Sequence, residues 1–286
     1  MEPSLPPAAL QPPPAALAGC VRAYIWRDLA ALPPTAPRDT RVPAGPYPGL
    51  SWLVRGAEVL NECAGQAVER PWPAIAVSGA HRHAYHSTAA PGTDFFCVAF
   101  EPCALAWLTG LDLHPLTDAM QDAPAWLSAM EDGDDWLAWL QAMQDAASHS
   151  ARMALAEAFL QPRWAVAQQR HAAWLPLLAQ GFRREARQAL AERLGCTPRH
   201  LQRQVRSLTG LRAGEVERML RVEQALLAMR DANATALDAA LGNGYADQAH
   251  FCREARALFE RPPALLRQHM HGSAAQAADA HWLLRR

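Results

Sequence analysis

One side of residues 197–210 carries guanidinium and carboxamide groups at helical spacing, namely Arg199, Gln202, Arg203 and Arg206. Such groups form paired hydrogen bonds with the edges of guanine and adenine, a geometry that a point charge cannot supply. The opposite side carries an apolar stripe formed by Leu201, Val205 and Leu208. The segment therefore predicts an amphipathic helix that buries one face and offers the other to a polar or anionic partner.

The residues that must start and place this helix precede it. Thr197 is a good N-cap because its hydroxyl accepts an amide proton of the first turn, and Pro198 fits the first helical position. Residues 187–194 form another helical pattern, which Gly195 and Cys196 end. An isolated amphipathic helix is more often a solvated surface helix, but helix, short turn and capped helix together form the helix-turn-helix motif. In that motif the second helix enters the major groove of DNA.

The same organisation recurs nearer the carboxyl end. Residues 234–241 predict a short helix, residues 242–244 a break, and residues 247–259 a second helix, whose start the charge of Asp247 favours. The inward stripe of this second helix consists of Phe251, Ala255 and Leu258, and the outward side of His250, Arg253 and Arg256. The helical pattern of residues 215–230 predicts a rigid connector. Two such units on one chain can occupy successive major-groove faces of one duplex.

Four sequence blocks follow one another in this part of the chain. They are residues 195–210 with their Leu-Thr-Gly ending, Arg-x3-Ala-Leu-Leu at 221–227, Gly-Tyr-Ala-Asp-Gln-Ala-His-Phe at 244–251, and Pro-x3-Arg ending at Arg267. In this order they resemble the AraC/XylS family of bacterial transcription regulators, over residues 165–270. Two residues depart from the family pattern: Ala246 stands where a Ser or similar cap is usual, and Glu260 stands where a Gly usually closes the last helix.

The resemblance implies a carboxyl-terminal domain with two helix-turn-helix units. It also implies that six side chains lie at positions that contact bases or phosphates in the family: Arg199, Gln202, Arg203, Gln248, His250 and Arg253. Together with Arg206 they are the candidate DNA-binding residues. Which of them reads bases and which binds phosphates is not decided by the sequence.

Charge divides the chain into two parts. Residues 1–162 hold 8 Arg against 17 Asp and Glu, a net charge of −9, whereas residues 163–272 hold 17 Arg against 10, a net charge of +7. The total of −1 thus hides an asymmetry that favours a polyanion partner for the basic part. We expect an α+β protein with a flexible leader at 1–16, a β-rich sensor or dimerisation domain at 17–162, an AraC-type DNA-binding domain at 163–271 and a tail at 272–286.

Short apolar segments punctuated by Pro and Gly fill residues 17–123 and predict a small barrel or sandwich. The clearest strand signal is at 95–100, an aromatic and β-branched run after a turn signal. The order of these segments resembles the amino-terminal β-rich module of one subset of AraC-like regulators. From about residue 124 the period is helical, and packing on the barrel and dimerisation are both open. Pro162 marks the expected domain joint, and residues 165–179 the first helix of the DNA-binding domain.

Two histidines raise a different chemistry. On a strand, His81 and His83 share a face and can bind one ion, but His86 falls on the other face. No carboxylate or thiol close in sequence completes the shell, so a loop or pocket with partly exposed histidines is the simpler interpretation, and we expect no metal and no cofactor. Core packing is the simplest role for the tryptophans, but a pocket in a β-rich sensor is also lined by such side chains, here Trp52, Trp72 and Trp107.

The sequence contains no motif of nucleophilic, phosphate-binding or zinc-protease catalysis, and we expect no enzymatic activity. Its six cysteines show no metal-binding spacing, and no apolar run approaches the ~18 residues of a membrane span. We therefore expect a cytoplasmic, sequence-specific DNA-binding transcription regulator. Its partner is double-stranded DNA, and RNA polymerase, a small-molecule effector and a second copy of the chain are candidate partners.

Two alternatives stay open at this point. One is a metal-dependent small-barrel enzyme that uses His81 and His83 and carries the carboxyl-terminal half as a DNA-binding tether. The other is an AraC-like regulator that senses no small molecule and is controlled by its abundance.

Overall fold

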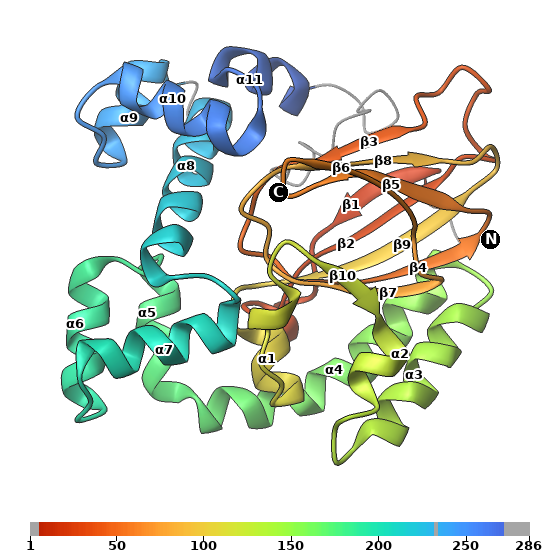
Figure 1. The fold of residues 1–286 in the computed structure, drawn as a ribbon, viewed down its shortest axis with the longest axis horizontal. Helices are drawn as coiled ribbons and strands as arrows, with labels where there is room; N and C mark the ends of the chain where they lie inside the picture. The colour runs from red at the N-terminus through yellow and green to blue at the C-terminus, as the bar shows by residue number, and fades with distance from the viewer. Residues whose placement is uncertain (1–5, 232–233, 272–286) are drawn as a thin grey trace.

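The computed structural model describes residues 6–231 and 234–271, so the tail expected at 272–286 lies outside the described residues. Two antiparallel sheets in the amino-terminal half form a β-sandwich, and helices lie beneath and beside it (Figure 1). The larger sheet has the strand order β1-β2-β9-β4-β7-β10, and the smaller sheet has the order β3-β8-β5-β6. The strands are β1 (Ala8–Gln11), β2 (Val21–Asp28), β3 (Asp39–Val42), β4 (Gly49–Arg55), β5 (Glu58–Cys63), β6 (Gln66–Pro71), β7 (Ile75–Ser78), β8 (Tyr85–Ala89), β9 (Asp94–Phe100) and β10 (Met120–Asp122).

The larger sheet has two different faces because successive side chains of a strand alternate. On one face Trp26, Trp52 and Phe96 are almost fully buried in a core shared with the helices. On the other face the neighbouring side chains, such as Ile25 and Cys97, point toward the smaller sheet. The strand expected at 95–100 is confirmed as β9, in the middle of this sheet.

Four helices cover the larger sheet from below in Figure 1: α1 (Ala104–Thr109), α2 (Ala123–Leu127), α3 (Gly133–Asp145) and α4 (His149–Arg170). An aromatic cluster centres on Trp139, which meets Trp52 edge-on at 5.6 Å and Trp136 edge-on at 5.5 Å, and stacks on Phe159 at 4.7 Å. The apolar residues of α3 therefore pack within the domain.

Two expectations about the chain ends of this domain are wrong. Residues 1–16 are not a loose leader throughout, because β1 pairs with β2 and the indole N–H of Trp26 donates to the carbonyl oxygen of Pro6 at 2.8 Å. No single helix spans residues 165–179. Helix α4 instead runs through Pro162 to Arg170, since the burial of its apolar side continues past that proline, and the short helix α5 (Leu175–Ala179) follows.

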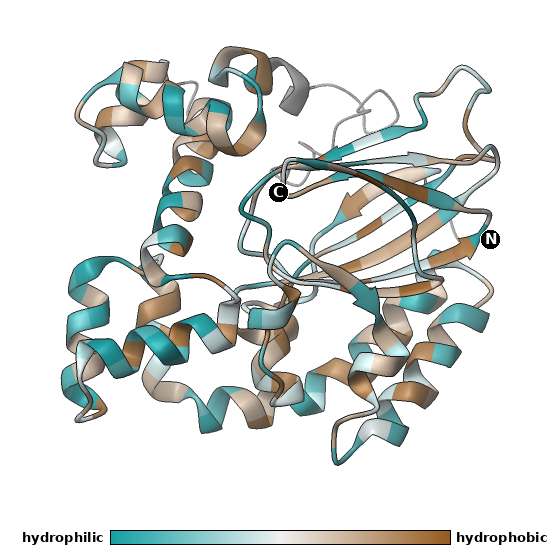
Figure 2. Cartoon of the chain, viewed as in Figure 1, coloured by the Kyte–Doolittle hydropathy of each residue, from teal (hydrophilic) through white to brown (hydrophobic). Residues whose placement is uncertain are grey.

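The carboxyl-terminal half is helical. The long helix α8 (Ala213–Asp231), expected at 215–230, connects two groups of shorter helices (Figure 1). The first group is α5, α6 (Arg184–Arg193) and α7 (Pro198–Thr209), and the second is α9 (Ala236–Gly242), α10 (Gln248–Phe259) and α11 (Pro263–His271). Hydrophobic and hydrophilic residues alternate along these helices, as they do in helices with one buried side (Figure 2). None of the helices in the described ranges is long and apolar enough to cross a membrane.

Candidate nucleic-acid interface

Helix α7 begins and ends where its sequence predicts. The Thr197 hydroxyl accepts a hydrogen bond from the amide of His200 at 3.2 Å, and Pro198 occupies the first turn. Gly210 ends the helix with φ of 80°, a left-handed conformation that glycine adopts without steric cost. The caps thus fix the helix in length, and its register decides which side chains face outward.

The two sides of α7 are separated by burial. Leu201 and Val205 are buried, and Leu208 is half-buried against the same core. All four candidate DNA-binding side chains of this helix are exposed: Arg199, Gln202, Arg203 and Arg206. Helix α6 packs against α7, and Gly195 in the turn between them has φ of 60°. The first unit therefore has the helix-turn-helix geometry, with its polar side free for a partner.

Helix α10 repeats this arrangement in the second unit. The Asp247 carboxylate caps the helix by accepting from the amide of His250 at 2.6 Å. The Ala246 position therefore loses no cap, because its neighbour supplies one. Phe251, Ala255 and Leu258 are buried, as their spacing predicts.

The candidate residues of α10 differ in exposure. Gln248 and Arg253 are exposed, whereas His250 is half-buried. The His250 ring meets the Tyr245 ring edge-on at 5.2 Å, and its Nε2 lies 3.9 Å from the Glu254 carboxylate. Gln248 and Arg253 thus lie on the outer side of α10, and His250 is partly exposed beside them while it contacts Tyr245 and Glu254 of the same unit.

Glu254 anchors α10 to the connector α8. Its carboxylate accepts from the Tyr245 hydroxyl at 2.9 Å and lies 3.5 Å from Arg221 and 3.7 Å from Arg218. The Arg221 guanidinium also lies over the Tyr245 ring at 4.9 Å. These contacts pair two partly exposed arginines of α8 with a carboxylate of α10, so part of the positive charge of the domain is used within the protein.

The arginines on the exposed sides of α7 and α10 differ in their partners from the two arginines of α8. Within the part of the chain that the structure describes, Arg199, Arg206 and Arg253 make no ion pair with a carboxylate. Nη2 of Arg203 lies 3.1 Å from Nδ1 of His200, and among the described residues Arg203 also pairs with no carboxylate. Unpaired guanidinium groups on exposed helix faces are suited to phosphates and base edges, since they give up no internal partner on binding.

The histidine hypothesis is not supported by the geometry. His81 is buried, and burial lowers its pKa to about 4, with a smaller opposing effect of Asp118. His83 is exposed. The two rings therefore do not share a solvent-facing site, and the described residues contain no group of three or more His, Cys, Asp or Glu that could hold a metal ion. No observation favours the enzyme alternative.

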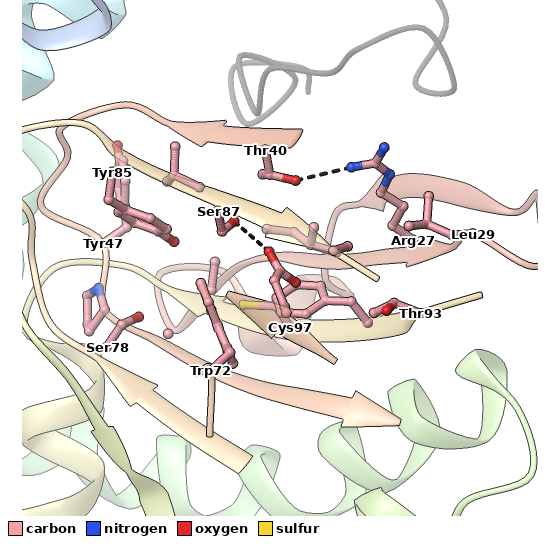
Figure 3. A pocket seen from close by; sticks show the side chains of 18 of the residues that line it. Arg27, Leu29, Thr40, Tyr47, Trp72, Ser78, Tyr85, Ser87, Thr93 and Cys97 are labelled. Carbon is pink, nitrogen blue, oxygen red and sulfur yellow. Dashed lines mark hydrogen bonds between the residues drawn. The ribbon is translucent and has the colours of Figure 1, made fainter. Parts of the chain in front are cut away.

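A cavity of about 110 Å³ lies between the two sheets of the β-sandwich, hereafter the sandwich cavity (Figure 3). Small residues on the larger sheet leave this space, among them Gly49, Ser78, Cys97 and Ala99. Aromatic side chains enclose it, including Tyr47, Trp72 and Tyr85. Of the three tryptophans with a candidate pocket role, Trp72 lines the cavity, whereas Trp52 and Trp107 lie in the core on the helix side.

The charged side chains of the cavity wall, Arg22, Arg27 and Glu58, were not identified from the sequence. Burial raises the pKa of the Glu58 carboxyl, against the opposing effects of a hydrogen bond from the Ser87 hydroxyl and of nearby Arg27. Burial lowers the pKa of the Arg27 guanidinium, whose Nη1 donates to the Thr40 hydroxyl at 3.1 Å (Figure 3). The sequence of these strands does not single them out, because β2 and β5 each carry further polar or charged residues.

Comparison with known proteins identifies the carboxyl-terminal part. Residues 190–269 match the family described as a helix-turn-helix domain. No curated protein sequence matches the chain significantly. Among solved structures, an apo form of ToxT from Vibrio cholerae is similar with a TM-score of 0.42 and 10% identity, covering 85% of this chain and 96% of that one. A ToxT structure of the same organism with a bound unsaturated fatty acid is similar with a TM-score of 0.39 and 11% identity, covering 80% of this chain and 92% of that one.

Proposed function

We propose that this chain, whose residues 190–269 form a helix-turn-helix domain of the AraC type, is a transcription regulator that binds a specific DNA site through both of its units. The observation that carries the proposal is the pair of capped helices α7 and α10, each with a buried apolar side and an exposed polar one. A DNA-binding regulator of this kind acts in the cytoplasm.

The proposed DNA contacts are divided between the two helices. Helix α7 enters one major groove with the side chains of Arg199, Gln202, Arg203 and Arg206. Helix α10 enters the next with those of Gln248, His250 and Arg253. Guanidinium and amide groups can bind base edges in pairs, at about 1–3 kcal/mol of discrimination each. Those of these arginines that do not contact bases bind phosphates. Such contacts strengthen binding to every DNA sequence alike.

The β-sandwich serves as the sensor in this proposal. The sandwich cavity of about 110 Å³ has less volume than the ~150 Å³ apolar cavity that binds benzene in another protein. A mostly apolar molecule no larger than a single ring is therefore the best candidate effector. Arg27 and Glu58 offer it a polar group to recognise. The proposed sensor domain, expected at 17–162, is extended by strand β1 before it and by the end of helix α4 after it. RNA polymerase and a second copy of the chain are further proposed partners.

Selection of bound sequences from a random DNA pool by the full chain tests the proposal. We expect one enriched sequence with two half-sites about one helical turn apart, and about 10³-fold or greater preference over a scrambled duplex. Affinity for both duplexes should fall as salt rises, because bound arginines release counterions. Absence of salt-dependent binding to any duplex would overturn the proposal.

The effector part is tested separately by thermal unfolding of the full chain with a panel of monocyclic aromatic compounds. A compound that fits the sandwich cavity should raise the unfolding temperature, since it binds only the folded state. The matched control fills the cavity: Ala99→Leu should abolish the shift. A shift that persists in this variant would place the compound elsewhere.

A further inference from the structure

Glu223 lies on the connector helix α8 but binds two residues of the β-sandwich. One carboxylate oxygen accepts from Nη2 of Arg22, and the other accepts from the hydroxyl of Tyr47. The side chains of Arg22 and Glu223 are only 3% and 7% exposed. A charge pair buried to this degree depends on both partners, because removal of one leaves the other charge without compensation.

Arg22 is aimed at this contact by the backbone. The pairing of β2 with β9 shifts between Val21 and Ala23, which makes Arg22 the extra residue of a β-bulge. Its guanidinium lies over the Tyr47 ring at 4.1 Å, and its Nη1 lies 3.6 Å from Glu101. The guanidinium is thus held between a ring and two carboxylates.

The same two sandwich residues border two cavities. Arg22 and Tyr47 line the sandwich cavity, and both also line a larger cavity of about 430 Å³ between the sandwich and helices α4, α5 and α8, to which Glu223 contributes. Figure 3 shows Tyr47 at one end of the sandwich cavity, beside Tyr85. A molecule in the sandwich cavity therefore touches the side chains that hold α8.

The amino-terminal domain also contacts the carboxyl ends of α7 and α10. The amide of Leu113 donates to the carbonyl oxygen of Ser207 at 2.8 Å, and the Thr117 hydroxyl donates to that of Gly210 at 2.8 Å. In the second unit the amide of Ala44 donates to the carbonyl oxygen of Leu258 at 2.9 Å. These contacts lie at the carboxyl ends of α7 and α10 and leave their polar sides exposed.

We propose that the contact of Glu223 with Arg22 and Tyr47 is a latch that braces the two helix-turn-helix units in their DNA-binding arrangement, and that occupancy of the sandwich cavity reaches the DNA through this latch. The inference rests on the proposed function. In the latched form the amino-terminal domain holds both units and the connector. The units therefore lose little conformational freedom when they bind DNA. Opening the latch frees the units to move relative to each other, and DNA affinity falls.

Glu223→Gln in the full chain tests the latch. The substitution keeps the shape of the side chain and removes one negative charge, so electrostatics alone would tighten binding to DNA. The latch predicts the opposite: weaker binding to the selected site by about fivefold or more, within the usual range of coupling between sites. The control is Glu217→Gln on the same helix, whose carboxylate pairs with Arg187 of the DNA-binding domain at 3.1 Å.

Hydrogen exchange of the α8 amides gives a second readout. Glu223→Gln should speed exchange in the middle of α8, and Glu217→Gln should not. Tyr47→Phe removes only a hydroxyl and should weaken DNA binding in the same direction, by less; it keeps the test decisive if Glu223→Gln does not fold.

Unchanged or tighter DNA binding by folded Glu223→Gln and by Tyr47→Phe would overturn the latch. That result leaves DNA binding by the unsubstituted chain intact, which is the separate requirement of the proposed function. A chain that binds no duplex at all would instead remove both.

Discussion

Nε2 of His86 lies 3.0 Å from the carboxylate of Glu260, which joins the outer side of strand β8 to the carboxyl end of helix α10. Nε of Arg41, on the neighbouring strand β3, lies 3.4 Å from the same carboxylate. Glu260 adopts φ of 55°, a left-handed conformation in which glycine is usual. The departure from the family pattern at this position thus has a structural reason, because a glycine could not reach the sandwich.

Two substitutions of Glu260 measure how much its left-handed backbone conformation lowers the free energy of unfolding. Glu260→Gly should raise the free energy of unfolding by about 1 kcal/mol relative to Glu260→Gln, since only the glycine relieves the left-handed backbone. Both variants lack the carboxylate, so loss of the ion pairs with Arg41 and His86 is common to them and cancels in the comparison. Denaturant unfolding of the two variants measures the difference. Equal stability would mean that the backbone at this position is not strained.

The local features of the DNA-binding half could be predicted from sequence because they depend on neighbours in the chain. The caps at Thr197 and Asp247 and the buried stripes lie within a few residues of the groups they contact. The pairing of Glu223 with Arg22 could not be predicted, since it joins positions 201 residues apart. Residues 1–16 looked disordered by composition, but β1 gains its order from β2, which no local pattern reveals.

Glu260 combines a local feature that the sequence shows with long-range contacts that it does not show. The sequence identified the residue as unusual for its place, but gave no information about Arg41 and His86, which become its neighbours only through the fold. The inward charges Arg27 and Glu58 follow the same rule, because the cavity that they line depends on how the two sheets pack.

Thr197→Ala tests the helix cap of the first unit. Loss of the hydroxyl that accepts from the His200 amide should lower the free energy of unfolding by about 1 kcal/mol. Thr197→Ser retains an accepting oxygen and should stay close to the unsubstituted chain. Thermal and denaturant unfolding measure both. An alanine variant as stable as the serine variant would show that the cap contributes nothing.

Arg203→Ala tests base reading by α7. We expect the preference for the selected site over a scrambled duplex to fall by about 1–3 kcal/mol, while binding to the scrambled duplex changes less. Arg55→Ala is the matched control, because this exposed arginine lies on strand β4 of the sandwich and pairs with Asp28. An unchanged ratio of specific to non-specific affinity would count against base reading by Arg203 and leave it a phosphate contact.

His81 should make the folded chain sensitive to acid. Its ring is buried, packs against Tyr85 at 4.6 Å, and its two nitrogens have no hydrogen-bond partner among the described residues. Burial lowers its pKa from 6.5 to about 4, and Asp118 opposes this effect only in part. The unfolded chain therefore binds a proton between pH 6.5 and about 4 that the folded chain does not. The contribution of the neutral His81 ring to the free energy of unfolding is therefore fully present above pH 6.5, and it decreases as pH falls from 6.5 to about 4.

The histidine contribution is measured by comparison with His81→Phe, which keeps a ring against Tyr85 and removes the titrating group. Other acidic groups titrate in the same range in both proteins, so the difference between them isolates His81. As pH falls from 7 to 4, the unsubstituted chain should lose about 3 kcal/mol of unfolding free energy relative to the variant, since each unit of pKa shift corresponds to ~1.4 kcal/mol. Parallel pH profiles would mean that the His81 ring is protonated as easily in the folded chain as in the unfolded one.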